Sequence, residues 1–186
     1  MKKILQKESA VLREISRDVP VPEIESPKIK NILKEMKEAL LSQDDGVAIA
    51  APQIGYNLRI FIVSKKVEDI IKNAKKDIPD EVSTKKEGRD LVFINPVIKK
   101  LSKEKKAVEE GCLSVRYLYG QVNRSKKATV EAYDEKGKKF SRGGSGLLAQ
   151  IFQHEIDHLN GILFIDTATN IEDLPPKKPA KNKKDE

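Results

Sequence analysis

The chain has 186 residues, of which 38% are hydrophobic and 35% are charged, a composition within the range of globular proteins. This length is typical of one domain with its own core, and a single cysteine excludes an internal disulfide. The formal net charge of +7 includes five lysines and two acidic residues in the last twelve positions, 175–186. With few aromatic residues for base stacking, the charge indicates a solvated tail and no DNA-binding role.

Neither a signal peptide nor a membrane span is expected. Charges interrupt the first 15 residues, MKKILQKESAVLREI, and no apolar run approaches the roughly 18 residues of a membrane helix. The N-terminal residues also do not resemble an organelle transit peptide. We therefore expect a cytoplasmic protein, of a bacterium, without a membrane partner.

The first predicted element is an amphipathic helix that begins after Ser26-Pro27, a pair typical of a helix N-terminus. We expect this helix to end near residues 44–46. Its apolar residues recur with helical spacing at Ile29, Ile32, Leu33, Met36 and Leu40.

Short β-type runs follow at 58–63, 91–98 and 128–134, and DEKGKKF after the last run is typical of a hairpin turn. In the intervening segment 65–90, 15 of 26 residues are charged, which predicts an exposed excursion with one marginal helix. A second clear helix is predicted over 145–159. Few strands, two clear helices and no βαβ alternation predict an α+β fold.

The second helix carries two neighbouring apolar stripes. We expect the core face to be formed by Leu148, Phe152, Ile156 and Leu159. The adjacent stripe consists of Leu147, Ile151, His154 and His158. These two histidines are the only ones in the chain, and the H-E-x-x-H spacing lets both imidazoles reach one metal ion while Glu155 handles a proton on a bound water. Two histidines without a metal remain the alternative.

A catalytic zinc-type site needs three protein ligands and one open position. In the metzincin pattern the third ligand is a histidine six residues after the second one, where this chain has Phe164. The third ligand must then be a thiolate or a carboxylate. Cys112, the lone cysteine, is the favoured candidate, and a zinc endopeptidase with a distant carboxylate ligand is the alternative.

Three motifs occur in the order GVAIAAPQIG (46–55), EGCLS (110–114) and QHEIDH (153–158). In these motifs and their flanks, over roughly residues 4–166, the chain resembles the peptide deformylase family. The resemblance implies a metal-dependent hydrolase that removes the formyl group from the formyl-methionine of nascent polypeptides. It also implies short antiparallel strands packed around a central metal-binding helix.

By this resemblance, Cys112, His154 and His158 hold one divalent metal ion, Fe(II) in the cell, with Zn, Ni or Co as possible replacements. Glu155 would act as general base and then as general acid. Residues 1–166 would form a single catalytic domain, and residues 167–186 a disordered Lys-rich tail that could contact the ribosome transiently.

The resemblance also assigns residues to the reacting amide and to the substrate. Gln53 and the backbone N–H of Leu113 would stabilise the oxyanion that develops on the formyl group. The methionine side chain would lie between two walls, formed by Leu147 and Ile151 on one side and by Gly46, Val47 and Ala48 on the other.

Residues around these positions are expected to support them. We expect Gln153 and Asp157 to have a structural role or to orient the ligand histidines, and not to take part in the chemistry directly. Glu110 is expected to pair with Arg124, a residue that also matches a family arginine, and an ordinary surface ion pair is the alternative.

The chain departs from the usual pattern of the family at the edge of the peptide cleft. Ala48 stands where the family has glycine, Arg116-Tyr117 replace a frequent Pro-Gly, and Tyr119 replaces an arginine. These changes leave open a second reading, a non-catalytic deformylase-like protein that binds nascent chains or ribosomal RNA.

Overall fold

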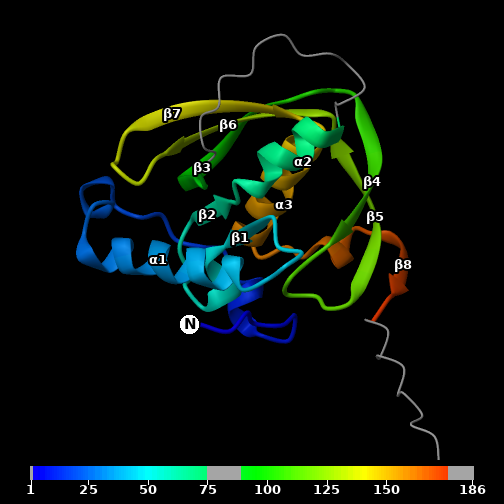
Figure 1. Cartoon of the computed structure of the whole chain (residues 1–186), viewed down its shortest axis with the longest axis horizontal. Coiled ribbons are helices and arrows are strands. Elements are labelled where there is room, and N and C mark those ends of the chain that lie inside the picture. Colours follow the sequence, from blue (N-terminus) through cyan, green and yellow to red (C-terminus); the bar gives the residue numbers. More distant parts are fainter. Residues whose placement is uncertain (1, 75–88, 176–186) are drawn as a thin grey trace, which may run out of the picture.

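The computed structural model describes residues 2–74 and 89–175, which form two antiparallel sheets and three α-helices (Figure 1). The larger sheet has the strand order β1-β2-β3-β6-β7, and the smaller sheet has the order β4-β5-β8. This arrangement confirms the predicted α+β class. The strands are β1 (Ala48–Ala50), β2 (Ile60–Val63), β3 (Leu91–Leu101), β4 (Lys105–Gly111), β5 (Leu118–Ser125), β6 (Lys127–Tyr133), β7 (Lys139–Ser145) and β8 (Thr169–Asp173). The α-helices are α1 (Pro27–Leu41), α2 (Lys66–Ala74) and α3 (Leu147–Leu159), and short 3-10 helices occur at Ala10–Arg13, Val21–Glu23, Ala51–Ile54 and Phe164–Asp166.

Strand β2 is buried on both faces of the larger sheet, which explains why it is continuously apolar. Successive side chains of a strand point to opposite faces. Ile60 and Ile62 of β2 accordingly pack in the core cluster that includes α1, whereas Phe61 and Val63 pack in the cluster that includes α3. Strands covered on both faces have this unbroken apolar pattern. The sheet thus separates the two helices.

Helix α1 begins as its sequence predicts and ends earlier. The Ser26 hydroxyl accepts a hydrogen bond from the N–H of Ile29 at 3.3 Å, and Pro27 occupies the first helical position. All five predicted core residues of the helix are buried. The helix ends at Leu41, not near residues 44–46, because the chain turns after Ser42, whose hydroxyl donates to the carbonyl of Ala39 at 2.7 Å.

Helix α3 packs its predicted core face against the larger sheet. Phe152 of this face is fully buried, and its ring contacts those of Phe61 and Phe93, with centroids 6.3 and 5.2 Å away. After the helix, Gly161 adopts a φ of +74°, and a Cβ atom there would lie 2.6 Å from the backbone oxygen of Arg13. These contacts fix both the face and the end of the helix that carries the histidines.

The smaller sheet was not predicted from the sequence. Strand β4 pairs with β5 along its whole length, from Lys105 to Gly111. Strand β8 adds to the other edge of β5, so ordered structure extends past the boundary expected at residue 166. All five residues of β8 are exposed, which explains why no apolar pattern marks this strand.

The charged segment after β2 contains one helix, α2, as expected, whereas residues 75–88 of that segment lie outside the described residues. The same holds for residues 176–186 of the predicted tail. Within residues 2–74 and 89–175, none of the helices combines the length and the apolar character that crossing a bilayer requires.

Candidate functional site

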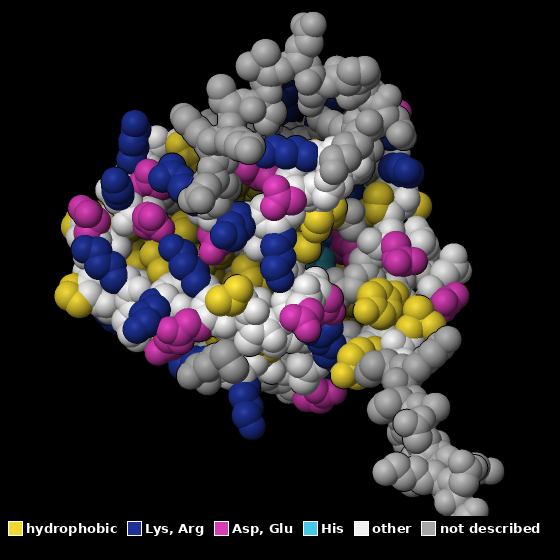
Figure 2. Space-filling view, in the orientation of Figure 1, with side chains coloured by type: hydrophobic (Ala, Val, Ile, Leu, Met, Phe, Trp, Pro, Cys, Tyr) yellow, Lys and Arg dark blue, Asp and Glu magenta, His cyan; other side chains and the backbone are white. Residues whose placement is uncertain are grey.

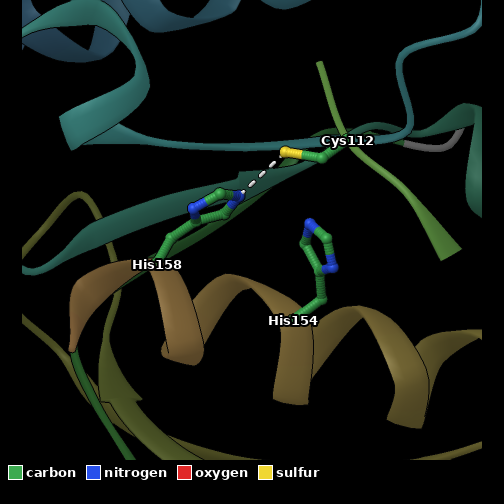
Figure 3. Close-up of side chains that lie close together, drawn as sticks. All are labelled: Cys112, His154 and His158. Atoms are coloured by element: carbon green, nitrogen blue, oxygen red, sulfur yellow. Dashed lines mark hydrogen bonds between the residues drawn. The ribbon is translucent and has the colours of Figure 1, made fainter. Parts of the chain in front are cut away.

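The three predicted metal ligands lie together at the junction of the two sheets. His154 and His158 project from successive turns of α3 toward Cys112, which directly follows β4 (Figure 3). One ligand atom from each residue lies within 4.8 Å of the other two, and Sγ of Cys112 is 3.2 Å from Nε2 of His158. Metal–ligand bonds of about 2.0–2.3 Å allow one ion to bridge atoms at this spacing.

A buried ionic network orients His154. Its Nδ1 lies 3.0 Å from Oε2 of Glu110, which leaves Nε2 free to face the other two ligands. Arg124 donates to both carboxylate oxygens of Glu110, at 2.8 and 2.9 Å, and to Asp157 at 2.6 Å. The predicted Glu110–Arg124 pair is thus a bidentate pair of two buried residues, and the surface alternative is wrong.

The ionisation states of Cys112 and His154 favour the binding of a cation. Burial raises the pKa of Cys112, but the charge of His158 and hydrogen bonds from both histidines outweigh it and lower that pKa to about 5. Burial also lowers the pKa of His154, but its bonds to Cys112 and Glu110 prevail and raise that pKa well above the usual value. Without an ion, therefore, a thiolate lies beside a proton held on imidazole. One thiolate and two imidazoles form a donor set that binds divalent transition metals, so these residues fit such an ion.

Glu155 lies between the two histidines in sequence and is buried. Burial is the main reason that its pKa rises to about 7, although the charges of His154 and His158 oppose the rise. Its Oε2 is buried without a hydrogen-bond partner among the described residues, as is Nδ1 of His158. A carboxyl group with this pKa can take up and release a proton near neutral pH.

Gln53 is held beside Cys112 by a set of buried bonds. Its Oε1 accepts from the N–H of Ala50 at 2.8 Å, and its Nε2 donates to Oγ of Ser114 at 3.1 Å. The same Nε2 lies 3.5 Å from Sγ of Cys112. The amide of Gln53 therefore faces the ligand cluster, and Leu113 lines the same pocket.

A cavity of about 280 Å³ adjoins the cluster. Its lining includes all five residues expected to bind substrate, namely Gly46, Val47, Ala48, Leu147 and Ile151. It also includes residues to which no role was assigned from the sequence, among them Asp45, Glu109, Gln150, Arg116, Tyr117 and Tyr119. The last three had a signal in the sequence, because they depart from the pattern of the family. Asp45 and Gln150 had none.

Gln153 and Asp157 differ in what they contact. Gln153 exchanges hydrogen bonds with the backbone of Ser125 and donates to the carbonyl of Ala149, so it attaches α3 to β5 and does not touch a histidine. Of the two roles expected for Gln153, the contacts fit the structural one and not the orientation of a ligand histidine, because its amide bonds only to backbone groups. Asp157 accepts a hydrogen bond from Arg124, which also binds Glu110, and Glu110 in turn contacts His154. Asp157 therefore supports the orientation of His154 indirectly.

Comparisons with known proteins agree with this geometry. The family model for polypeptide deformylase matches residues 1–173. Peptide deformylase 2 of Clostridium acetobutylicum is 41% identical over 169 residues, which cover 91% of this chain and 96% of that protein. The peptide deformylase of Desulforudis audaxviator is 39% identical and covers 90% of this chain and 94% of that protein.

Solved structures that resemble this chain are also peptide deformylases. A class I type b peptide deformylase from Acinetobacter baumannii with Met-Ala-Ser bound has a TM-score of 0.72 at 31% identity, covering 88% of this chain and 96% of that one. A peptide deformylase from Synechococcus elongatus in complex with actinonin has a TM-score of 0.72 at 29% identity, covering 91% and 79%. The chain belongs to the polypeptide deformylase family, the metal-dependent hydrolases that remove the formyl group from nascent peptides.

Proposed function

We propose that this chain deformylates the N-terminal formyl-methionine of nascent polypeptides with one divalent metal ion held by Cys112, His154 and His158. The observation that carries the proposal is the convergence of these three ligand atoms within 4.8 Å beside a buried Glu155. When bound, such an ion supplies a Lewis acid for the formyl oxygen and lowers the pKa of a coordinated water.

Glu155 supplies the proton transfers. Its carboxylate accepts a proton from the water that attacks the formyl carbon, and then delivers a proton to the leaving amine as the C–N bond breaks and formate departs. Burial raises the pKa of this carboxyl group above its usual value, which makes its carboxylate a stronger base than that of an exposed glutamate. Such catalysis typically contributes about 10² to 10⁴ in rate.

Gln53 and Leu113 stabilise the negative charge on the formyl oxygen. The bond from Ala50 to Oε1 of Gln53 turns its Nε2 toward Cys112, and the N–H of Leu113 follows Cys112 directly in the chain. Donors that are held in place before the reaction begins need no reorganisation as the charge develops.

The cavity beside the cluster receives the methionine side chain. Leu147 and Ile151 line it from α3, and Val47 lines it from the segment before β1. The structural neighbour that binds Met-Ala-Ser, the peptide part of a deformylated substrate, supports this use of the pocket. Gly46 and Ala48 offer backbone beside which an extended peptide can pair.

The remaining expectations concern the ion, the domain and the setting. We propose Fe(II) as the ion in the cell, with Zn, Ni or Co as replacements, because a mixed thiolate and imidazole set accepts all four. We propose one catalytic domain that includes β8, in a cytoplasmic protein. Contact of the Lys-rich residues after 175 with the ribosome stays a prediction.

The proposal is tested by formate release from formyl-Met-Ala-Ser. Protein prepared without oxygen is stripped of metal and reloaded with Fe(II), Zn, Ni or Co, and the bound metal is counted in each sample. We expect one metal ion per chain, no activity in the stripped protein, and restored activity with Fe(II). Failure of every fully loaded sample to release formate would favour the non-catalytic reading, which no comparison supports.

A further inference from the structure

An ion pair joins the two walls of the pocket. Arg116, in the segment that follows Cys112, donates through Nη1 and Nη2 to the two carboxylate oxygens of Asp45, at 2.5 and 3.1 Å. Its Nη2 also donates to Oε1 of Gln43 at 2.8 Å. Asp45 directly precedes the Gly46–Ala48 wall, and both charged residues line the cavity. We call Asp45 and Arg116 the rim pair.

The exposure of the neighbouring residues places the rim pair at the open end of the pocket. Along one wall, the chain goes from fully buried Ala50 to Asp45, whose side chain is 56% exposed. Along the other wall, it goes from fully buried Ser114 to Tyr117, which is 40% exposed. Figure 2 shows a histidine at the bottom of a hollow, with acidic and basic side chains near its opening.

The position of the rim pair matters because the substrate is the end of a longer chain. On the proposed function, the formyl group reaches the ligand cluster and the methionine side chain fills the cavity. The peptide that follows must then leave through the open end, past Asp45 and Arg116. Both residues are charged at neutral pH, because their mutual hydrogen bonds lower the pKa of Asp45 and raise the pKa of Arg116.

We propose that the rim pair determines how the enzyme selects among charges in the peptide residues that follow the methionine. In the bidentate pair, each charge largely cancels the other, so the pair itself adds little net charge to the rim that acidic and basic peptides meet. If one member is lost, the other is left to attract peptides of opposite charge and to repel those of like charge. The two losses must therefore change selectivity in opposite directions.

The experiment compares Arg116→Gln with Asp45→Asn. The substrates are the carboxamides formyl-Met-Ala-Lys and formyl-Met-Ala-Glu, with a second pair that carries the charge directly after methionine. The quantity compared is the ratio of kcat/KM for the Lys peptide to kcat/KM for the Glu peptide. We expect Arg116→Gln to raise this ratio about two- to fivefold and Asp45→Asn to lower it by a similar factor. The ratio for the parent protein should lie between those of the two variants, and the differences among the three ratios should shrink at high salt.

A matched control is Arg13→Gln, which breaks the Arg13–Asp166 pair, an ion pair of the same two residue types that does not line the cavity. It should leave the Lys/Glu ratio unchanged. If both rim variants lose kcat/KM equally on all peptides, the rim pair has only a structural role and the proposal is overturned. An unchanged Lys/Glu ratio in the rim variants would also overturn it.

Binding separates this inference from the proposed function. The same peptides are titrated into Glu155→Gln protein with and without each rim substitution, and the ratio of the two Kd values is compared. Opposite shifts in that ratio support the rim pair even if the parent releases no formate, which would contradict only the proposed function. Shifts of the same sign overturn the rim pair even in an active enzyme.

Discussion

Oε2 of Glu110 lies 3.0 Å from Nδ1 of His154, so a carboxylate from the end of β4 sets which nitrogen of this helix histidine faces the other two proposed metal ligands. Glu110 is itself held on both oxygens by Arg124. Partners of this kind fix the tautomer and the orientation of a ligand imidazole. The site therefore depends on the smaller sheet as much as on α3.

Substitution of Glu110 by glutamine should weaken metal binding. An amide in place of the carboxylate is a weaker acceptor for His154 and loses the charge that pairs with Arg124. We expect metal affinity to fall about 10- to 100-fold, measured by competition with a chelator. Glu109→Gln, at the exposed neighbouring position, is the control and should leave the affinity unchanged. Equal affinities in the parent and Glu110→Gln would contradict this role.

Arg124→Met should destabilise the metal-free fold by about 3–5 kcal/mol, because it removes the charged partner that binds both oxygens of the buried Glu110 carboxylate and also binds Asp157. The free energy of unfolding is measured by urea denaturation in the presence of a chelator. Arg13→Met breaks a more exposed Arg–Asp pair and should cost at most about 1 kcal/mol. Similar losses of unfolding free energy in the two variants would show that burial of the network does not make Arg124 more important for stability than an exposed arginine.

Gly161→Ala should destabilise the protein through backbone strain and a backbone clash. The residue has a φ of +74°, and its Cβ would lie 2.6 Å from the carbonyl oxygen of Arg13. Gly137 has a similar φ of +70° but has no atom within 4 Å of a built Cβ. Gly137→Ala should thus cost about 1 kcal/mol of strain, and Gly161→Ala about 1–3 kcal/mol more. Equal melting temperatures for the two variants would contradict the proposed contact.

The stability of the fold should depend on pH through Asp166. Burial would raise the pKa of Asp166, but the bonds from Arg13 and from the N–H of Leu163 outweigh it and hold that pKa below its usual value. Because the folded pKa is depressed, the stabilisation is present above the unfolded pKa of about 3.9 and is lost as pH falls through the folded pKa.

The measurement is the unfolding free energy of the parent minus that of Asp166→Asn, followed from pH 7 to pH 3. We expect this difference to be constant down to about pH 5 and then to shrink. A difference that stays constant to pH 3 would mean that the charge of Asp166 does not contribute.

The helices and the residues that we propose as metal ligands could be identified in the sequence because their signals are local. The 3.6-residue period of α3 gave both its core face and the stripe with His154 and His158. The single cysteine made Cys112 the natural third ligand, although its distance from the histidines depends on the whole fold.

The smaller sheet was harder to predict because its inward positions are not all apolar. Glu110 and Arg124 are buried on β4 and β5, where a strand pattern would lead one to expect hydrophobic residues. Gly120, also on the inward face, lies close to Ala168 and interrupts the pattern further. Similarly, Asp45 and Arg116 are 71 positions apart, and only the fold brings them together.

The most direct test of the account is a side-by-side assay of the parent and Glu155→Gln, both loaded with Fe(II) without oxygen. Metal per chain and formate released from formyl-Met-Ala-Ser are measured on the same samples. We expect one metal ion in each protein and a turnover at least about 10²-fold lower in the variant. Undiminished turnover by Glu155→Gln with its metal bound would contradict the role of Glu155 as the group that moves the proton.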